Sequence, residues 1–157
     1  MPPPVILDPA GLSDSPLIAG PEAVMALNPQ RHEFQLLDGI VYANRETMTF
    51  AGFHDVRTDA WWTRGHIPGR PLFPGVLMIE VAAQLASFVT HQVQPEDRFI
   101  GFAAVDGVKF RGAIAPPARF LVIGRAKSIK RRRTICDTQG FVDGVMVFEA
   151  QITGMPV

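Results

Sequence analysis

The sequence predicts an α+β fold in which one long helix packs against an antiparallel sheet. Two observations carry this prediction. Residues 75–94 form a single apolar, helix-like run, and strand-like runs lie both before and after it. Strands joined by short turns after a single long helix favour one antiparallel sheet over alternating βαβ units.

The first half of the chain contains a short helix, two strands and a long loop. Pro21 begins a helix that Pro29 ends, since proline suits a first helical turn but cannot continue a helix. Residues 33–54 are expected to form two strands with a turn near Asn44-Arg45. Residues 55–74 lack hydrophobic periodicity, and their prolines at every third position predict an extended loop.

The second half is expected to contribute most of the sheet, with strands at residues 99–110, 119–128, 134–142 and 145–153. Asp143-Gly144 has the composition of a two-residue hairpin turn. Asp38-Gly39 and Asp106-Gly107 resemble it, but each lies inside a longer strand pattern and predicts a bulge or bend.

Composition and charge exclude several classes of protein. Lys plus Arg and Asp plus Glu both number 15, a balance that argues against a protein that neutralises many nucleic-acid phosphates. The single cysteine, Cys136, cannot form an intramolecular disulfide. We expect no membrane span, because Glu80 and Gln84 interrupt the longest apolar stretch, and no secretory signal, which makes the cytoplasm the expected location.

The chain divides into a proline-rich arm, residues 1–21, and a single domain, residues 22–157. Prolines predict an extended, irregular arm. Its apolar residues are consistent with packing on another surface, such as a partner subunit, and a free tail is the alternative.

Glu80 is the most unusual residue of the predicted helix, because apolar residues surround it on every side. An unpaired buried carboxylate is costly, so Glu80 is expected to be paired, protonated or used in chemistry. Gln84 lies one turn later on the same face and can hydrogen-bond it.

The residues at the helix start complete a plausible set of catalytic groups. Gly75 and Val76 present free backbone N–H groups at the positive end of the helix dipole, where developing negative charge is stabilised. His66 lies upstream on the loop, and histidine is suited to proton abstraction near neutral pH. A base, an acid and a carbonyl-polarising helix end are the parts needed for elimination beside a thioester.

Structural interpretations remain open on these residues alone. A histidine that follows a glycine in a loop is most often a hydrogen-bonded structural residue. Glu80 could equally be an ion-pair partner of Arg64 or Arg70.

The stretch GHIPGRPLFPGVLMIEVAAQ, residues 65–84, resembles the signature G-H-F-P-G-x-P-x-x-P-G-V-x-x-x-E-x-x-A-Q. This is the signature of the 3-hydroxyacyl-[acyl-carrier-protein] dehydratases of bacterial fatty-acid synthesis, the FabZ/FabA group. The segment PQRHEF, residues 29–34, is similar to the family's P-H-R-Y-P-F, and the resemblance extends over roughly residues 23–154. Ile67 stands where the family has Phe, and Glu33 where it has Pro.

The resemblance implies a hotdog fold, a long central helix wrapped by a curved antiparallel sheet. It implies a homodimer, with a trimer of dimers left open, in which the histidine of one subunit faces the acid of the other. His66 would take the C2 proton, Glu80 would protonate the departing C3 hydroxyl, and Gly75 would polarise the thioester carbonyl. It further implies no metal or redox cofactor, and a substrate carried on the phosphopantetheine of an acyl carrier protein, with coenzyme A as the alternative carrier. Glu rather than Asp at position 80 resembles the branch that dehydrates without isomerising the double bond.

The chain has one basic cluster, which consists of Lys127, Lys130, Arg131, Arg132 and Arg133. A solvated strand end and turn is one interpretation. A docking patch for an acidic carrier protein is the other, since complementary charge speeds encounter.

Two alternative functions compete with dehydration. A hotdog acyl-thioester hydrolase would use a carboxylate on the same helix to activate water. A hotdog module that binds acyl carriers without turnover would keep the fold and lose the chemistry. The His66–Glu80 register and the P-G-V signature argue against the hydrolase. The presence of both His66 and Glu80 argues against the non-catalytic module, while the departures from the signature around the site keep it open.

Overall fold

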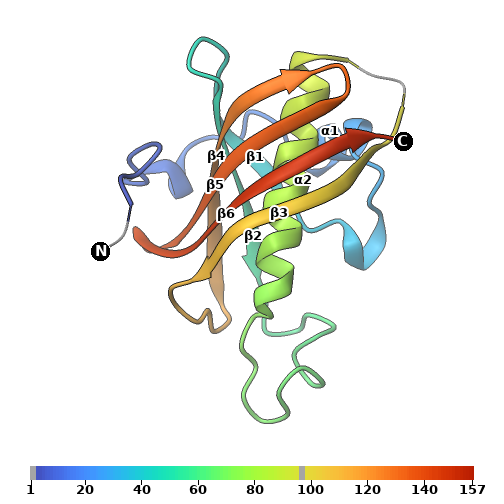
Figure 1. The fold of residues 1–157 in the computed structure, drawn as a ribbon. Helices are drawn as coiled ribbons and strands as arrows, with labels where there is room; N and C mark the ends of the chain where they lie inside the picture. Colours follow the sequence, from blue (N-terminus) through green and yellow to red (C-terminus); the bar gives the residue numbers. More distant parts are fainter. Residues whose placement is uncertain (1–2, 96–97) are drawn as a thin grey trace.

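The computed structural model describes residues 3–95 and 98–157 and confirms the α+β prediction. Figure 1 shows a curved antiparallel sheet wrapped around one long helix, the hotdog arrangement. The strand order across the sheet is β1-β2-β4-β5-β6-β3, so that β1 and β3 form its two edges. The helices and strands are α1 (Pro21–Leu27), β1 (Gly39–Asn44), β2 (Thr49–Val56), α2 (Gly75–Val93), β3 (Ile100–Phe110), β4 (Ala118–Lys130), β5 (Arg133–Val142) and β6 (Val145–Pro156).

The main core lies between α2 and the concave face of the sheet. Leu77, Val81, Leu85 and Phe88 are buried on the sheet-facing side of the helix. By length and composition α2 could cross a membrane, yet 56% of the relevant window is buried inside the molecule. Its hydropathy is that of a core helix, because burial against a sheet requires the same residues as burial in lipid.

The apolar surroundings of Glu80 predicted a helix buried on every side, but one face of α2 is partly exposed. Val76 is 70% exposed, and Ile79, Glu80, Ala83 and Ser87 are partly exposed. These five residues repeat at helical spacing and form one stripe along the helix. The sheet of a single chain wraps only part of the helix and leaves this stripe uncovered.

The prediction of a strand from residue 33 is wrong, because β1 begins at Gly39. Residues His32–Phe34 form a short 3-10 helix instead, and the backbone N–H groups of Leu36 and Leu37 bond to the side chain of Gln84 rather than to a strand. Asp38-Gly39 therefore marks the start of β1, not a bend within it. The segment is extended, but its hydrogen-bond partner lies on a helix.

The turn predictions in the second half are confirmed. Asp143 and Gly144 have φ angles of 50° and 78°, the left-handed conformation that a tight two-residue hairpin requires. At Asp106-Gly107 the pairing of β3 with β6 shifts register, and Gly107 has a φ of 59°. This is the expected bulge.

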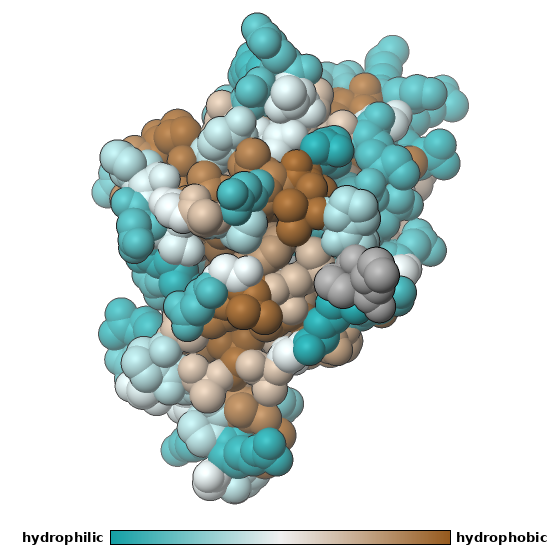
Figure 2. Space-filling view, turned by 90° about the vertical axis from the view of Figure 1, so that its left-hand side faces the viewer, coloured by the Kyte–Doolittle hydropathy of each residue, from teal (hydrophilic) through white to brown (hydrophobic). Residues whose placement is uncertain are grey.

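The N-terminal arm lies on the outer face of its own sheet. Ile6, Leu7 and Leu12 pack on a second apolar cluster formed by β1, β2, β4 and β5. The arm is also fixed by hydrogen bonds, from Gln139 Nε2 to Pro4 O and from Arg119 to Ser13 O. Figure 2 shows the side of the molecule on which the arm lies, where hydrophobic side chains gather in the middle and hydrophilic ones surround them. The arm thus closes a second, smaller core.

Candidate active site

Four of the site residues predicted from sequence line two separate pockets of one chain, while Val76 lines neither and is exposed. His66 and Gly75 line a groove at the N-terminal end of α2, together with Phe110 of β3. Glu80 and Gln84 line a different pocket, between α2 and the beginning of β3. Five residues separate Gly75 from Glu80, which rotates the two positions by about 140° around the helix axis. A single chain therefore presents two half-sites that face different directions.

His66 is held on an exposed loop in a defined tautomer. Its backbone N–H donates to Trp62 O at 2.9 Å, and Trp62 is buried against the ring of Phe73. Its side-chain Nδ1 lies 2.9 Å from Leu72 O. A carbonyl oxygen can only accept, so Nδ1 carries a proton, and in the neutral ring the lone pair is on Nε2. The imidazole is therefore arranged as a base at Nε2.

The start of α2 lies beside this imidazole. Pro74 precedes the helix, and no side chain caps its first turn. Within the described residues, the N–H groups of Gly75 and Val76 have no backbone or side-chain acceptor. The helix dipole adds partial positive charge at this point, so the helix start can stabilise a developing oxyanion.

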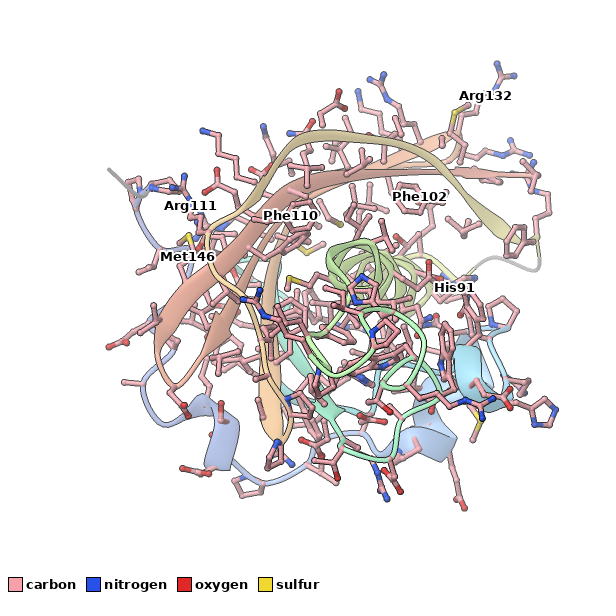
Figure 3. The ribbon with its side chains drawn as sticks, turned by 90° about the horizontal axis from the view of Figure 1, so that it is seen from below. His91, Phe102, Phe110, Arg111, Arg132 and Met146 are labelled. Carbon is pink, nitrogen blue, oxygen red and sulfur yellow. The ribbon has the colours of Figure 1, made fainter. Side chains whose placement is uncertain are left out.

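Gly75 packs closely against the ring of Phe110. A Cβ at this position would lie 3.0 Å from the ring of Phe110. Figure 3 looks along α2 from its N-terminal end and labels Phe110. The ring narrows the groove that His66 lines, a contact between distant segments that the sequence did not predict.

Glu80 belongs to a saturated hydrogen-bond network. Gln84 Nε2 donates to Glu80 Oε1 at 2.8 Å and to Phe34 O at 2.7 Å. Gln84 Oε1 accepts from the backbone N–H groups of Leu36 and Leu37, both at 3.1 Å. Gln84 is 2% exposed, and these four bonds use its full capacity. Gln84 orients Glu80, and no ion pair joins Glu80 to Arg64 or Arg70 in the described part of the chain.

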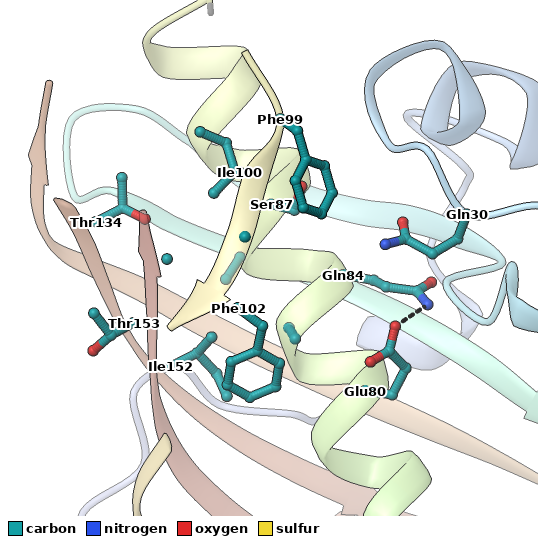
Figure 4. A pocket seen from close by; sticks show the side chains of 14 residues that line it. Gln30, Glu80, Gln84, Ser87, Phe99, Ile100, Phe102, Thr134, Ile152 and Thr153 are labelled. Carbon is teal, nitrogen blue, oxygen red and sulfur yellow. Dashed lines mark hydrogen bonds between the residues drawn. The ribbon is translucent and has the colours of Figure 1, made fainter. Parts of the chain in front are cut away.

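The pocket around Glu80 continues along α2 toward Ser87 (Figure 4). Its volume is about 90 Å³. Apolar side chains of β3 and β6 form one wall, and the side chain of Gln30 enters from the opposite side. Sequence reasoning did not single out Gln30, although it lies in the segment that resembles P-H-R-Y-P-F.

The basic cluster lies at the turn between β4 and β5, and all five of its side chains are exposed. Lys127 is 3.8 Å from Asp137, and Arg132 projects away from the body of the molecule in Figure 3. Arg133 directly precedes Thr134, which lines the Glu80 pocket. The start of β5 thus links the cluster to one residue of the pocket, and none of the five cluster residues lines the pocket itself.

A model of the FabA-like domain matches residues 28–151. The chain belongs to the FabA-like domain family. It is 33% identical over 138 residues to the 3-hydroxyacyl-[acyl-carrier-protein] dehydratases FabZ of Brucella ovis and Brucella suis, which covers 85% of this chain and 86% of each relative.

Solved structures agree on the fold of this FabA-like domain. The dehydratase heterocomplex ApeI:P from Xenorhabdus doucetiae superposes with a TM-score of 0.73 at 11% identity, covering 85% of this chain and 90% of that one. A hypothetical thioesterase with coenzyme A from Streptococcus pneumoniae gives a TM-score of 0.57 at 9% identity, covering 87% and 92%. At such identities the likeness establishes the hotdog fold alone.

Proposed function

We propose that this protein removes water from (3R)-3-hydroxyacyl thioesters on an acyl carrier protein and forms trans-2-enoyl thioesters. The observation that carries the proposal is the complementarity of the two half-sites. One offers an imidazole base beside free helix-start N–H groups, and the other offers a carboxyl group on an uncovered helix face.

The chemistry follows from these groups. Nε2 of His66 takes a proton from C2 while the N–H of Gly75 stabilises the negative charge on the thioester oxygen. The electron pair then forms the C2–C3 double bond as the C3–O bond breaks. Glu80 gives its proton to the departing oxygen, which leaves as water. These steps need no metal or redox cofactor, and none of them moves the new double bond.

The proposal includes a homodimer, because each site needs His66 from one chain and Glu80 from another. The helix stripe that contains Val76 and Glu80 lies uncovered, and β3 is an unpaired sheet edge. Phe102 and Phe110 on that edge are 46% and 52% exposed. An apolar edge strand beside an apolar helix face is suited to a self-complementary interface. A trimer of dimers is compatible with the same contacts.

The basic cluster is proposed as the docking surface for the acidic carrier protein. Its position next to the Glu80 pocket lets a flexible phosphopantetheine arm reach the site from a carrier bound there. Complementary charge would raise the association rate more than the affinity of the complex. The cytoplasm is the proposed location. The one cysteine, Cys136, is compatible with any redox environment, because burial raises the pKa of its thiol to about 12 and keeps it unreactive.

The experiment is an absorbance assay for the enoyl thioester, with 3-hydroxyacyl and crotonyl substrates of several chain lengths on carrier protein and on coenzyme A. Wild type should turn over, and His66→Ala and Glu80→Gln should each lose about 10²–10⁴-fold in kcat. His91→Ala is the matched histidine control, because His91 lies at the far end of α2. A folded wild-type dimer that converts no thioester would contradict the proposal, as would release of free thiol without any enoyl product.

A further inference from the structure

Gln30 Oε1 is the one fully buried side-chain acceptor of the Glu80 pocket that lacks a hydrogen-bond partner among the described residues. Asn28 Oδ1 is also buried without a partner, but Asn28 does not line the pocket. The neighbouring amide of Gln84 has no remaining capacity. A buried carbonyl without a donor costs about 1–3 kcal/mol. Such an atom is expected to meet a donor in the working state of the protein.

The segment that presents Gln30 is rigidly held. Arg31 donates to three backbone carbonyls, those of Met25, Asn28 and Gln30 itself, at 2.8–2.9 Å. Asn28 Nδ2 donates to Gln84 O at 2.9 Å and ties the segment to α2. The backbone that carries Gln30 is thus held in place, which reduces the cost of ordering this acceptor when a ligand binds.

A molecule that enters the pocket at Glu80 can supply this donor. Figure 4 shows the side chains of Gln30 and Glu80 on either side of Gln84. The proposed reaction brings the C3 hydroxyl of the substrate to Glu80, and this hydroxyl is the only O–H donor at the reacting carbons. The opposite wall combines the apolar side chains of Phe99, Phe102 and Ile152 with the hydroxyl groups of Thr134 and Thr153, and these hydroxyls lie across the pocket from Glu80, whereas Gln30 lies on the Glu80 side.

We propose that the side-chain carbonyl of Gln30 accepts a hydrogen bond from the C3 hydroxyl and so selects and orients hydroxylated substrates. The inference rests on the proposed dehydration. The hydroxyl hydrogen points to Gln30, which leaves the oxygen lone pairs directed at the proton of Glu80. When the C3–O bond breaks, that proton completes a water molecule whose original O–H still donates to Gln30. Gln30 therefore holds both the substrate hydroxyl and the product water.

The test uses the full-length chain and two non-reacting ligands of equal length. In a Glu80→Gln background, the dissociation constants of 3-hydroxyacyl and saturated acyl carrier protein are compared with and without Gln30→Met. Methionine keeps the length of the side chain and removes the amide acceptor. The hydroxylated ligand should bind about 3–10-fold more weakly, as expected for one neutral hydrogen bond, while the saturated ligand changes less than twofold.

Stability and rescue separate this role from a structural one. Gln30→Met removes an unpaired buried acceptor, so the melting temperature should stay level or rise, whereas loss of a structural bond would lower it. Gln30→His restores a ring-nitrogen acceptor and should recover most of the dehydration kcat/KM that Gln30→Met loses.

Equal weakening of both ligands would overturn the proposal, because it would place the contact on the carrier arm or the acyl tail. A lowered melting temperature with no hydroxyl discrimination would overturn it as well. Failure of the proposed function looks different. A wild-type protein that distinguishes the two ligands through Gln30 but releases no enoyl product would lose the dehydratase assignment and keep the hydroxyl contact.

Discussion

The two half-sites of this chain are built in different ways. His66 lies on an exposed loop and depends on one backbone carbonyl for its orientation. Glu80 lies on a core helix and is oriented by Gln84, a buried amide with four partners. The Glu80 half is therefore part of the folding core, whereas the His66 half stands apart from it. Substitutions should affect stability in one half and activity alone in the other.

Gln84→Leu should produce the largest effect on stability. It removes the partner of two buried backbone N–H groups, those of Leu36 and Leu37, and of the partly buried carbonyl of Phe34. Each buried unpaired group costs about 1–3 kcal/mol, so the free energy of unfolding should fall by about 2 kcal/mol or more. Turnover should fall as well, because Glu80 loses its donor.

Chemical denaturation of this variant is compared with Gln92→Leu, an exposed position on the same helix that should change stability by no more than about 0.5 kcal/mol. Equal stability of the two variants would show that the Gln84 network does not hold the Glu80 half in place.

Gly75→Ala should separate activity from stability in the His66 half. The added Cβ would displace the ring of Phe110, which lines the same groove as His66. We expect about a tenfold loss of kcat/KM, and a change in unfolding free energy below about 1 kcal/mol, since the exposed ring can move. A large loss of stability with unchanged kcat/KM would contradict the conclusion that the His66 half contributes to activity and little to stability.

Arg132→Glu should have the smallest effect and act only on encounter with the carrier. A single exposed charge reversal should raise KM for carrier-linked substrate a few-fold at low salt, and the difference should shrink as salt screens the charge. KM for the coenzyme A thioester should stay the same. An equal change in KM for the carrier-linked and the coenzyme A substrate would show that Arg132 does not contact the carrier protein.

Much of this architecture could be predicted from local sequence. The helix at residues 75–94, the Asp143-Gly144 turn and the bulge at Asp106-Gly107 each follow from residue type and spacing, and the structure has all three. Residues 33–38 could not be placed, because the backbone N–H groups of Leu36 and Leu37 bond to a glutamine side chain about fifty positions away. Extended segments look alike in sequence, whether their backbone groups hydrogen-bond to a neighbouring strand or to a side chain.

The site shows the same division. His66, Gly75, Glu80 and Gln84 were found because they share one short stretch with a recognisable pattern. Gln30 and Phe110 were missed as site residues, because only the folded chain brings them to the two pockets. The separation of His66 from Glu80 within one chain is also a consequence of tertiary structure, and the proposal of a site shared between two chains rests on it.

Mixing the two inactive variants tests this shared site most directly. His66→Ala and Glu80→Gln proteins are unfolded together, refolded and assayed with 3-hydroxyacyl carrier protein. In a mixed dimer one site carries both substitutions and the other carries neither, so random pairing should restore about a quarter of wild-type activity. If the mixture stays inactive while distinguishable tags show that mixed dimers have formed, the two residues do not meet across subunits and the account is wrong.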